Sequence, residues 1–268
     1  MSWAGIKKAI NRAGAQVKMK TGQIEETVDP EYELEEKRFR AMEDASEKLQ
    51  KELKDYLRLL QLITDAQFNV GDALNSFYAT NENEEGNEHR YMSQQFFEVV
   101  KTINGTSVGE LEGPFNLTVL TPVARFNSYY PSINDAIKKC SHKKLDYDSM
   151  KTKVNKLMEK SDPEQQQEPK FDQYQRQLSQ CENDFISINN QLKKELPQLI
   201  DLRIPYLDPS FEAFVKLQLR FFNENFNYFD NLQKKLDAKT REDYISGTLE
   251  QRIDDNIAKI SKLSEALR

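Results

Sequence analysis

The sequence predicts an all-α protein whose long, bent, antiparallel helices pack as a three-helix coiled coil. Only 38% of the 268 residues are apolar and 31% are charged, a balance that suits long helices with narrow buried faces. Nine glycines and nine prolines are few for this length, so few turns are expected. Apolar residues recur at heptad spacing over long stretches, and no strand alternation of useful length occurs. The apolar faces are extensive enough to form a dimer.

The first long helix is expected to begin at Asp29-Pro30-Glu31, which supplies a capping carboxylate, a proline at the first helical position and an acid in the first turn. Apolar residues then recur every seven positions for about five heptads. They are Met42, Leu49, Tyr56, Ile63, Val70 and Phe77, with Leu53, Leu60 and Leu74 at companion positions. The polar run TNENEEGNEHR is expected to form the following loop.

A second long helix is expected from about Ser107, where Ser107 and Glu110 can form a capping box, to about Lys160. Pro122 and Pro131 should bend it, because proline removes a backbone hydrogen bond. The polar stretch SDPEQQQEP then predicts a tight turn between helices.

The third long helix follows this turn, with apolar residues at alternating spacings of three and four from Phe171 to Leu192. Three prolines, Pro197, Pro205 and Pro209, are expected to interrupt it before it continues through FVKLQLRFFNENFNYFDNL. A last helix is expected after Thr240.

The N-terminal segment differs from the rest of the chain in charge. Residues 1–20 carry five basic side chains and no acid, although the whole chain has a formal net charge of -6. On a helical wheel the apolar residues of this segment fall within about 80° of one another, with basic residues on the flanks and far side. Such a helix can lie among lipid headgroups with its apolar face inserted. The residues assigned to insertion are Trp3, Ile6, Lys7, Lys8, Ile10, Arg12, Ala13 and Val17.

A second cationic cluster lies between residues 138 and 160, where eight lysines accompany three acidic side chains. If this segment is helical, six of its basic residues share an arc of about 100° opposite the apolar residues, and Lys143 and Lys144 lie outside it. This arc, which we call the basic stripe, can face an anionic surface. Its members are Lys138, Lys139, His142, Lys153, Lys156 and Lys160.

Other interpretations of both segments are open at this stage. The N-terminal segment could be a mitochondrial presequence or a helix docked on the protein's own core. The lysine run could be an ordinary solvated face, and lysines alone do not exclude nucleic acid, although the acidic remainder and the lack of a groove-reading motif oppose it. The main rival function is a dimeric helical scaffold that binds a small GTPase or a cytoskeletal partner without remodelling membranes.

The remaining residues do not indicate an enzyme, and no cofactor or metal is expected. The chain has two histidines, His89 and His142, and no glycine motif typical of nucleotide binding. Cys140 and Cys181 lie far apart and are typical of buried thiols in a reducing compartment. No apolar run approaches the roughly 18 residues of a membrane span, and no secretory signal is recognisable, so a cytoplasmic location is predicted.

Four segments resemble the amphiphysin-type BAR domains, in particular the short fungal Rvs-type members without an SH3 domain. The segments are SWAGIKKAINRAG, DPEYELEEKRF, IKKCSHKKLDYDSMKTKV and LKKELPQLIDLR, and the resemblance covers nearly the whole chain. It implies a crescent-shaped dimer of three-helix coiled coils whose N-terminal helix folds on contact with lipid. By position it assigns anionic lipid binding to Lys138, Lys139, Lys143, Lys144, Lys153, Lys156 and Lys160.

The resemblance also implies a function. Such a protein binds anionic phospholipid membranes and senses or generates curvature in endocytosis and actin patch organisation, at the plasma membrane and cortical actin patches. The expected partners are a second copy or a longer SH3-containing BAR relative, and actin-associated proteins. The expected domains are a membrane-inserting helix at 1–24, the BAR three-helix core at 25–240, and a C-terminal helix packed on the core at 241–268.

Overall fold

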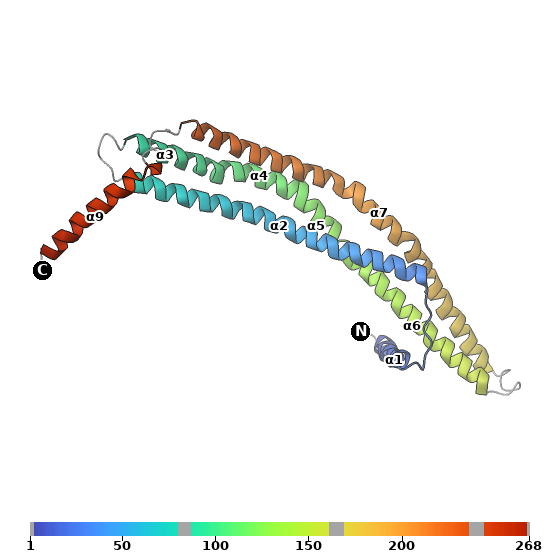
Figure 1. The fold of residues 1–268 in the computed structure, drawn as a ribbon. Coiled ribbons are helices and arrows are strands. Elements are labelled where there is room, and N and C mark those ends of the chain that lie inside the picture. The colour runs from blue at the N-terminus through green and yellow to red at the C-terminus, as the bar shows by residue number, and fades with distance from the viewer. Residues whose placement is uncertain (1–2, 80–86, 161–168, 236–243, 267–268) are drawn as a thin grey trace. The chain divides into compact units, whose positions relative to one another are not determined.

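The computed structural model describes residues 3–79, 87–160, 169–235 and 244–266 (Figure 1), without the side chains of 4–8, 87–90, 160, 169–170 and 264–266. These residues form helices joined by turns and contain no strand, so the all-α prediction is confirmed. The helices in chain order are α1 (Trp3–Lys20), α2 (Pro30–Ala79), α3 (Asn87–Thr102), η2 (Ile103–Ser107), α4 (Val108–Phe115), η3 (Asn116–Leu120), α5 (Thr121–Asn127), α6 (Tyr130–Lys160), α7 (Pro169–Gln233) and α9 (Thr248–Ala266).

The start of α2 lies where the sequence predicts it, because Asp29 caps the helix. The Asp29 Oδ1 atom accepts a hydrogen bond from the backbone N–H of Tyr32 at 3.2 Å, and Pro30 is the first helical residue. The helix then runs unbroken for 50 residues.

The second helical stretch begins earlier than expected. Residues 87–90, which we assigned to a loop from their polarity, form the first turn of α3. Ser107, the expected helix cap, is instead a buried residue at the end of η2. Polarity is misleading here because α3 is amphipathic and its apolar residues follow Tyr91, after a polar first turn.

The prolines of this stretch do not bend a single helix as expected. A turn at Ser128 and Tyr129 separates α5 from α6. Pro131 lies in the first turn of α6, after this break, where a backbone N–H has no intrahelical acceptor, so its loss costs little. Pro122 lies at the start of α5, which follows η3 without a break, so its missing N–H removes one hydrogen bond from a continuous helix.

Two short π-helical segments, η2 and η3, explain the spacing of the buried residues in this stretch. The N–H of Val108 bonds to the carbonyl of Ile103, and that of Thr121 to Asn116, so each turn holds one residue more than an α-turn. Four residues rotate an ideal α-helix by about 400°, so a repeat of four drifts by about 40° per step. The wider turns offset this drift. The buried residues with this spacing are Ile103, Ser107, Leu111, Phe115, Val119 and Val123.

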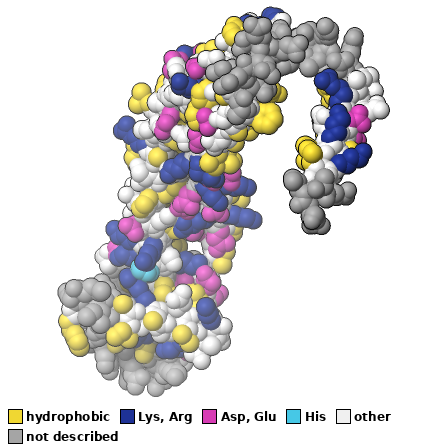
Figure 2. Space-filling view, turned by 90° about the vertical axis from the view of Figure 1, so that its left-hand side faces the viewer, with side chains coloured by type: hydrophobic (Ala, Val, Ile, Leu, Met, Phe, Trp, Pro, Cys, Tyr) yellow, Lys and Arg dark blue, Asp and Glu magenta, His cyan; other side chains and the backbone are white. Residues whose placement is uncertain are grey.

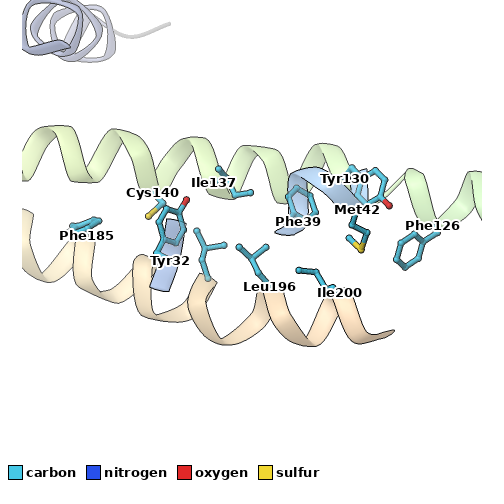
Figure 3. Close-up of a cluster of buried hydrophobic side chains, with 11 residues drawn as sticks. Tyr32, Phe39, Met42, Phe126, Tyr130, Ile137, Cys140, Phe185, Leu196 and Ile200 are labelled. Carbon is cyan, nitrogen blue, oxygen red and sulfur yellow. The ribbon is translucent and has the colours of Figure 1, made fainter. Parts of the chain in front are cut away.

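The chain forms two compact units, which we treat separately. Unit 1 comprises Met1–Tyr56 and Phe115–Phe214, and unit 2 comprises Leu57–Pro114 and Val215–Arg268. In unit 1, side chains from α2, from α5 and α6, and from α7 point toward one another (Figure 3). The rings of Phe39 and Tyr130 meet edge to face with centroids 5.7 Å apart. Cys140 is buried in the same cluster, as expected for a thiol that acts as a small apolar residue.

Unit 2 also packs three helical segments together. The rings of Phe68 in α2 and Phe97 in α3 have centroids 5.4 Å apart, and Phe96 lies 6.4 Å from Phe229 in α7. Thr64 of α2 donates a hydrogen bond to the side chain of Asn104 in η2 at 3.1 Å. Each unit therefore has its own three-helix core.

The helix α7 continues through three prolines without a break. It spans 65 residues and contains Pro197, Pro205 and Pro209, which we expected to interrupt it. The neighbouring residues Leu196 and Ile200 are buried in the unit 1 core, so tertiary packing offsets the lost hydrogen bonds.

In the C-terminal helix α9 the apolar side chains Ile253, Ile257, Ile260 and Leu263 are all more than half exposed in the single chain. The packing of residues 241–268 on the core stays a prediction. No helix in the described part of the chain is long and apolar enough to cross a bilayer.

Candidate functional site

The two cationic segments found in the sequence lie against each other in unit 1. Helix α1 packs on α6 (Figure 1). Arg12 donates two hydrogen bonds to Asp146, from Nε to Oδ1 at 2.8 Å and from Nη2 to Oδ2 at 2.6 Å. Their side chains are only 23% and 27% exposed. The hydrogen bonds to Asp146 raise the pKa of the Arg12 guanidinium above its ordinary value, so the guanidinium is charged at all physiological pH values.

The linker between α1 and α2 is also held on α6. Thr27 Oγ1 donates to Asp148 Oδ1 at 2.6 Å, and the Thr27 N–H donates to Oδ2 at 3.2 Å. Lys144 forms an ion pair with Glu26 at 2.6 Å. Asp148 is fully buried, so this carboxylate needs these donors to be stable. Ile24 of the linker is buried as well.

The face of α1 that meets α6 is not its apolar face. Arg12, Ala15 and Met19 share one side of the helix and are its least exposed described side chains. Ala15 is only 6% exposed. The apolar residues assigned to insertion lie on the opposite side and are open to solvent, with Trp3 83% exposed; the others with described side chains are Ile10, Ala13 and Val17.

A groove of about 1340 Å³ lies between α1, α6 and the start of α7. Lys18 of α1 and Lys153 and Lys156 of α6 line it. The Nζ atom of Lys153 lies 4.0 Å from the ring centroid of Tyr174, a favourable cation–π contact. None of these three lysines forms an ion pair with another described residue, so their positive charges are available to an anionic ligand.

The predicted lipid-binding lysines fall into two groups. Lys138, Lys139, Lys153 and Lys156 are exposed. Lys143 and Lys144, which lie off the basic stripe, are paired instead with Asp184 and Glu26. The side chains of Ile6, Lys7, Lys8 and Lys160 lie outside the described residues. Figure 2 shows one face of the molecule, on which basic side chains lie among acidic ones rather than in a purely basic field.

Several residues of this site were missed from the sequence. The sequence gives Asp146 and Asp148, the acceptors for Arg12 and Thr27, no predicted role beyond lowering the net charge of the lysine run and belonging to a segment that resembles the family. Their two-residue spacing within a lysine-rich helix was an available signal. Tyr174, whose ring lies beneath Lys153, belongs by its spacing to the apolar repeat between Phe171 and Leu192, and that repeat does not predict a contact with a lysine.

A second candidate surface lies in unit 2 and is apolar. Several residues of the predicted heptad repeat of α2 are exposed, and so are residues of α7 within this unit. On a helical wheel each set follows one face of its helix. The set, which we call the apolar surface, comprises Leu59, Ile63, Val70, Leu74 and Phe77 of α2 and Val215, Leu219, Phe222 and Phe226 of α7. Exposed apolar side chains gathered on one face of a helix are typical of a protein interface.

Comparison with known proteins identifies the family. The BAR domain model matches residues 6–238, which is most of the chain. The chain belongs to the BAR domain family. BAR domains are dimeric structural scaffolds of curved membranes and are not enzymes, which confirms the prediction of a non-catalytic protein.

The similar BAR proteins include fungal ones that this chain matches over nearly their whole length. The RVS161-like protein RVS162 of Candida albicans is 44% identical, with 98% of each chain covered. Protein hob3 of Schizosaccharomyces pombe is 44% identical over 99% of this chain and 98% of its own. The regulator of cytoskeleton and endocytosis RVS161 of Candida albicans is 38% identical over 98% of both chains. These relatives confirm the resemblance to the short Rvs-type members.

Solved structures agree on the BAR fold. The amphiphysin BAR domain from Drosophila superposes with a TM-score of 0.58 and 19% identity, covering 81% of this chain and 96% of its own. A BAR protein from Galdieria sulphuraria gives a TM-score of 0.54 at 14% identity, covering 77% of this chain and 97% of its own. At these identities the likeness concerns the fold alone.

Proposed function

We propose that this BAR protein binds anionic membranes through α1 and α6 of unit 1, and that it senses or generates curvature in endocytosis and actin patch organisation. The observation that carries the proposal is the exposed apolar face of α1 beside the free lysines of α6. The two features suit the two parts of a lipid monolayer, the acyl boundary and the anionic headgroups.

The expected free energy of membrane binding is small for one copy of the surface and sufficient for the two copies of a dimer. Each lysine near an anionic leaflet contributes about 1 kcal/mol. Burial of a large apolar side chain such as Trp3 or Ile10 adds about 1.5–3 kcal/mol before the cost of ordering. Two copies of the surface on one dimer bind together with much higher avidity. A crescent-shaped dimer would match a curved membrane better than a flat one, which would make binding depend on curvature.

The proposed dimer forms through the apolar surface of unit 2, either between two copies or with a longer SH3-containing BAR relative. In this proposal the dimer binds to the surface of the plasma membrane and is found at cortical actin patches, where actin-associated proteins are its partners. The similarity to a protein named regulator of cytoskeleton and endocytosis supports this location. In this proposal residues 1–24 contact the membrane and residues 25–240 form the core.

The proposal is tested by co-sedimentation with vesicles that contain phosphatidylserine, at two diameters and at low and high salt, with the mass in solution measured alongside. We expect a dimer that prefers the smaller vesicles and loses affinity at high salt, because salt screens the attraction of the lysines. A folded dimer that binds vesicles of neither size would instead indicate a protein scaffold for a GTPase or cytoskeletal partner.

A pair of charge-reversal variants localises the surface. Lys153→Glu with Lys156→Glu should weaken vesicle binding by about 30-fold or more, from at least about 1 kcal/mol per lysine. Lys48→Glu with Lys51→Glu changes the net charge equally on exposed positions of α2 and should have a much smaller effect. Equal losses from both variants would contradict a specific site on α6.

A further inference from the structure

We propose that Asp146 is a positioning residue that seats α1 on α6 with its apolar face outward, so that the helix meets a membrane already folded and oriented. This inference rests on the proposed membrane function, which it deepens. It differs from the expectation that the N-terminal helix folds only on contact with lipid.

The orientation follows from which side chains of α1 are covered. Arg12, Ala15 and Met19 recur at spacings of three and four and therefore lie on one side, against α6. On an ideal helix this side points about 170° away from the apolar residues Ile10 and Val17. A helix docked to hide its apolar residues would have these two covered, yet both are more than 60% exposed. The contact with α6 thus leaves the inserting face free.

The main polar contact at this interface is the Arg12–Asp146 pair. The guanidinium and the carboxylate meet through two parallel hydrogen bonds, a geometry that fixes the rotation of α1 about its axis as well as its distance from α6. A single contact between flexible side chains would not fix this rotation. Because the pair and the apolar residues are on opposite sides, insertion does not require the pair to break.

The chain after α1 limits how far the helix can move. The left-handed Gly22, with φ of 72°, ends α1, and the N–H groups of Gly22 and Gln23 bond back to the carbonyls of Met19 and Lys18. Thr27 is bound to the buried Asp148. Only the four residues 23–26 separate Gly22 from this anchor, so α1 stays close to α6 and the Arg12–Asp146 pair sets its orientation.

The decisive variant is Asp146→Asn, because two models of its effect have opposite signs. If Asp146 acts only as one more negative charge, its removal should tighten binding to anionic vesicles. If it seats α1, binding should weaken and insertion of Trp3 should decrease. Asp135→Asn removes a charge from an exposed position of the same helix, where the structure gives no contact with α1, and is the matched control.

Trp3 is the only tryptophan of the chain, so its fluorescence reports α1 alone. The probe is a vesicle of phosphatidylcholine and phosphatidylserine, with and without brominated acyl chains. For the wild type we expect a blue shift and bromine quenching with little change in helix content by circular dichroism. For Asp146→Asn we expect roughly fivefold weaker quenching at equal lipid, while Asp135→Asn binds as tightly as the wild type or more tightly. A large gain of helix in the wild type on lipid binding would overturn the inference.

A lipid-free measurement separates this inference from the proposed function. Trypsin should cleave within α1 about fivefold faster in Asp146→Asn than in the wild type or Asp135→Asn, because the unseated helix opens more often. The exchange variant Arg12→Asp with Asp146→Arg should restore protection that each single change removes. If the wild type fails to bind any vesicle but shows this protection pattern, the membrane proposal fails while the seating stands. If Asp146→Asn is protected like the wild type and binds vesicles more tightly, the seating is overturned and the membrane proposal stands.

Discussion

Gly71 of α2 lies directly against Val100 of α3 in unit 2. A methyl group on Gly71 would meet Cγ2 of Val100 at 2.5 Å and the backbone Cα of Phe97 at 3.4 Å. Val100 is fully buried, so it has little room to move away. The glycine therefore sets how closely α2 and α3 approach each other.

Substitution Gly71→Ala is expected to destabilise the protein although alanine is the better helix former. Overpacking costs about 1–3 kcal/mol, which exceeds the gain in helix propensity of about 1 kcal/mol at most. Gly109→Ala in α4 is the control, since its added methyl group would have no neighbour within 4 Å. Thermal unfolding should show a lower Tm for Gly71→Ala and an unchanged or higher Tm for Gly109→Ala. Equal stability of the two variants would contradict the close contact.

The cap of α2 is expected to make stability depend on pH. Burial raises the pKa of Asp29, but Lys193 at 3.0 Å, Asn189 at 2.6 Å and the N–H of Tyr32 outweigh it, so the pKa lies below its ordinary value. The stabilisation is therefore present above the unfolded-state pKa of about 3.9 and is lost as pH falls through the lower folded-state pKa.

Asp29→Asn tests this dependence, because asparagine keeps the helix cap but loses the ion pair with Lys193. We expect the variant to be less stable than the wild type at pH 7, with the difference in free energy of unfolding shrinking below about pH 4. Denaturant titrations at several pH values measure it. Glu33→Gln, in the same helical turn, controls for loss of a negative charge near the helix start. A difference that stays constant down to pH 2 would argue against the ion pair as its cause.

The apolar surface of unit 2 is expected to support the dimer. Val70→Asp or Leu219→Asp puts a charge where an apolar side chain would be buried, at a cost of about 1.5–3 kcal/mol or more per side chain. In a twofold-symmetric dimer each substitution is present on both subunits, so its cost applies twice. The dissociation constant of the dimer should therefore rise by about 100-fold or more. Sedimentation equilibrium measures the change. Leu202→Asp, equally exposed but in unit 1, should leave the dimer intact; the reverse pattern would locate the interface elsewhere.

The heptad repeat of α2 shows both the power and the limit of sequence patterns. It correctly predicts that Met42, Leu53 and Leu60 are buried. It also includes Val70 and Phe77, which are exposed in the single chain. A repeat identifies residues that share a face, but it does not say whether their partner belongs to the same chain or to another copy.

The seating of α1 was less accessible to sequence reasoning. Periodicity gave the apolar face of the helix, and composition gave its charge. The pairing of Arg12 with Asp146 joins residues 134 positions apart, and no local pattern connects them. Arg12 was assigned to the lipid surface for its charge, whereas the structure directs it to α6.

The π-helical segment η2 makes this part of the chain tolerant of a change in length. Deleting one of the exposed residues Gly105 and Thr106 would let the segment close into an ordinary α-helix, which restores regular hydrogen bonds. Because the wide turn already absorbs one extra residue, the side chains of α3 would keep nearly the same direction relative to α4, and Val100 would still face Gly71. The same deletion from a regular α-helix would rotate one side of the helix by about 100° relative to the other. A chain one residue shorter at this point could therefore keep the unit 2 core.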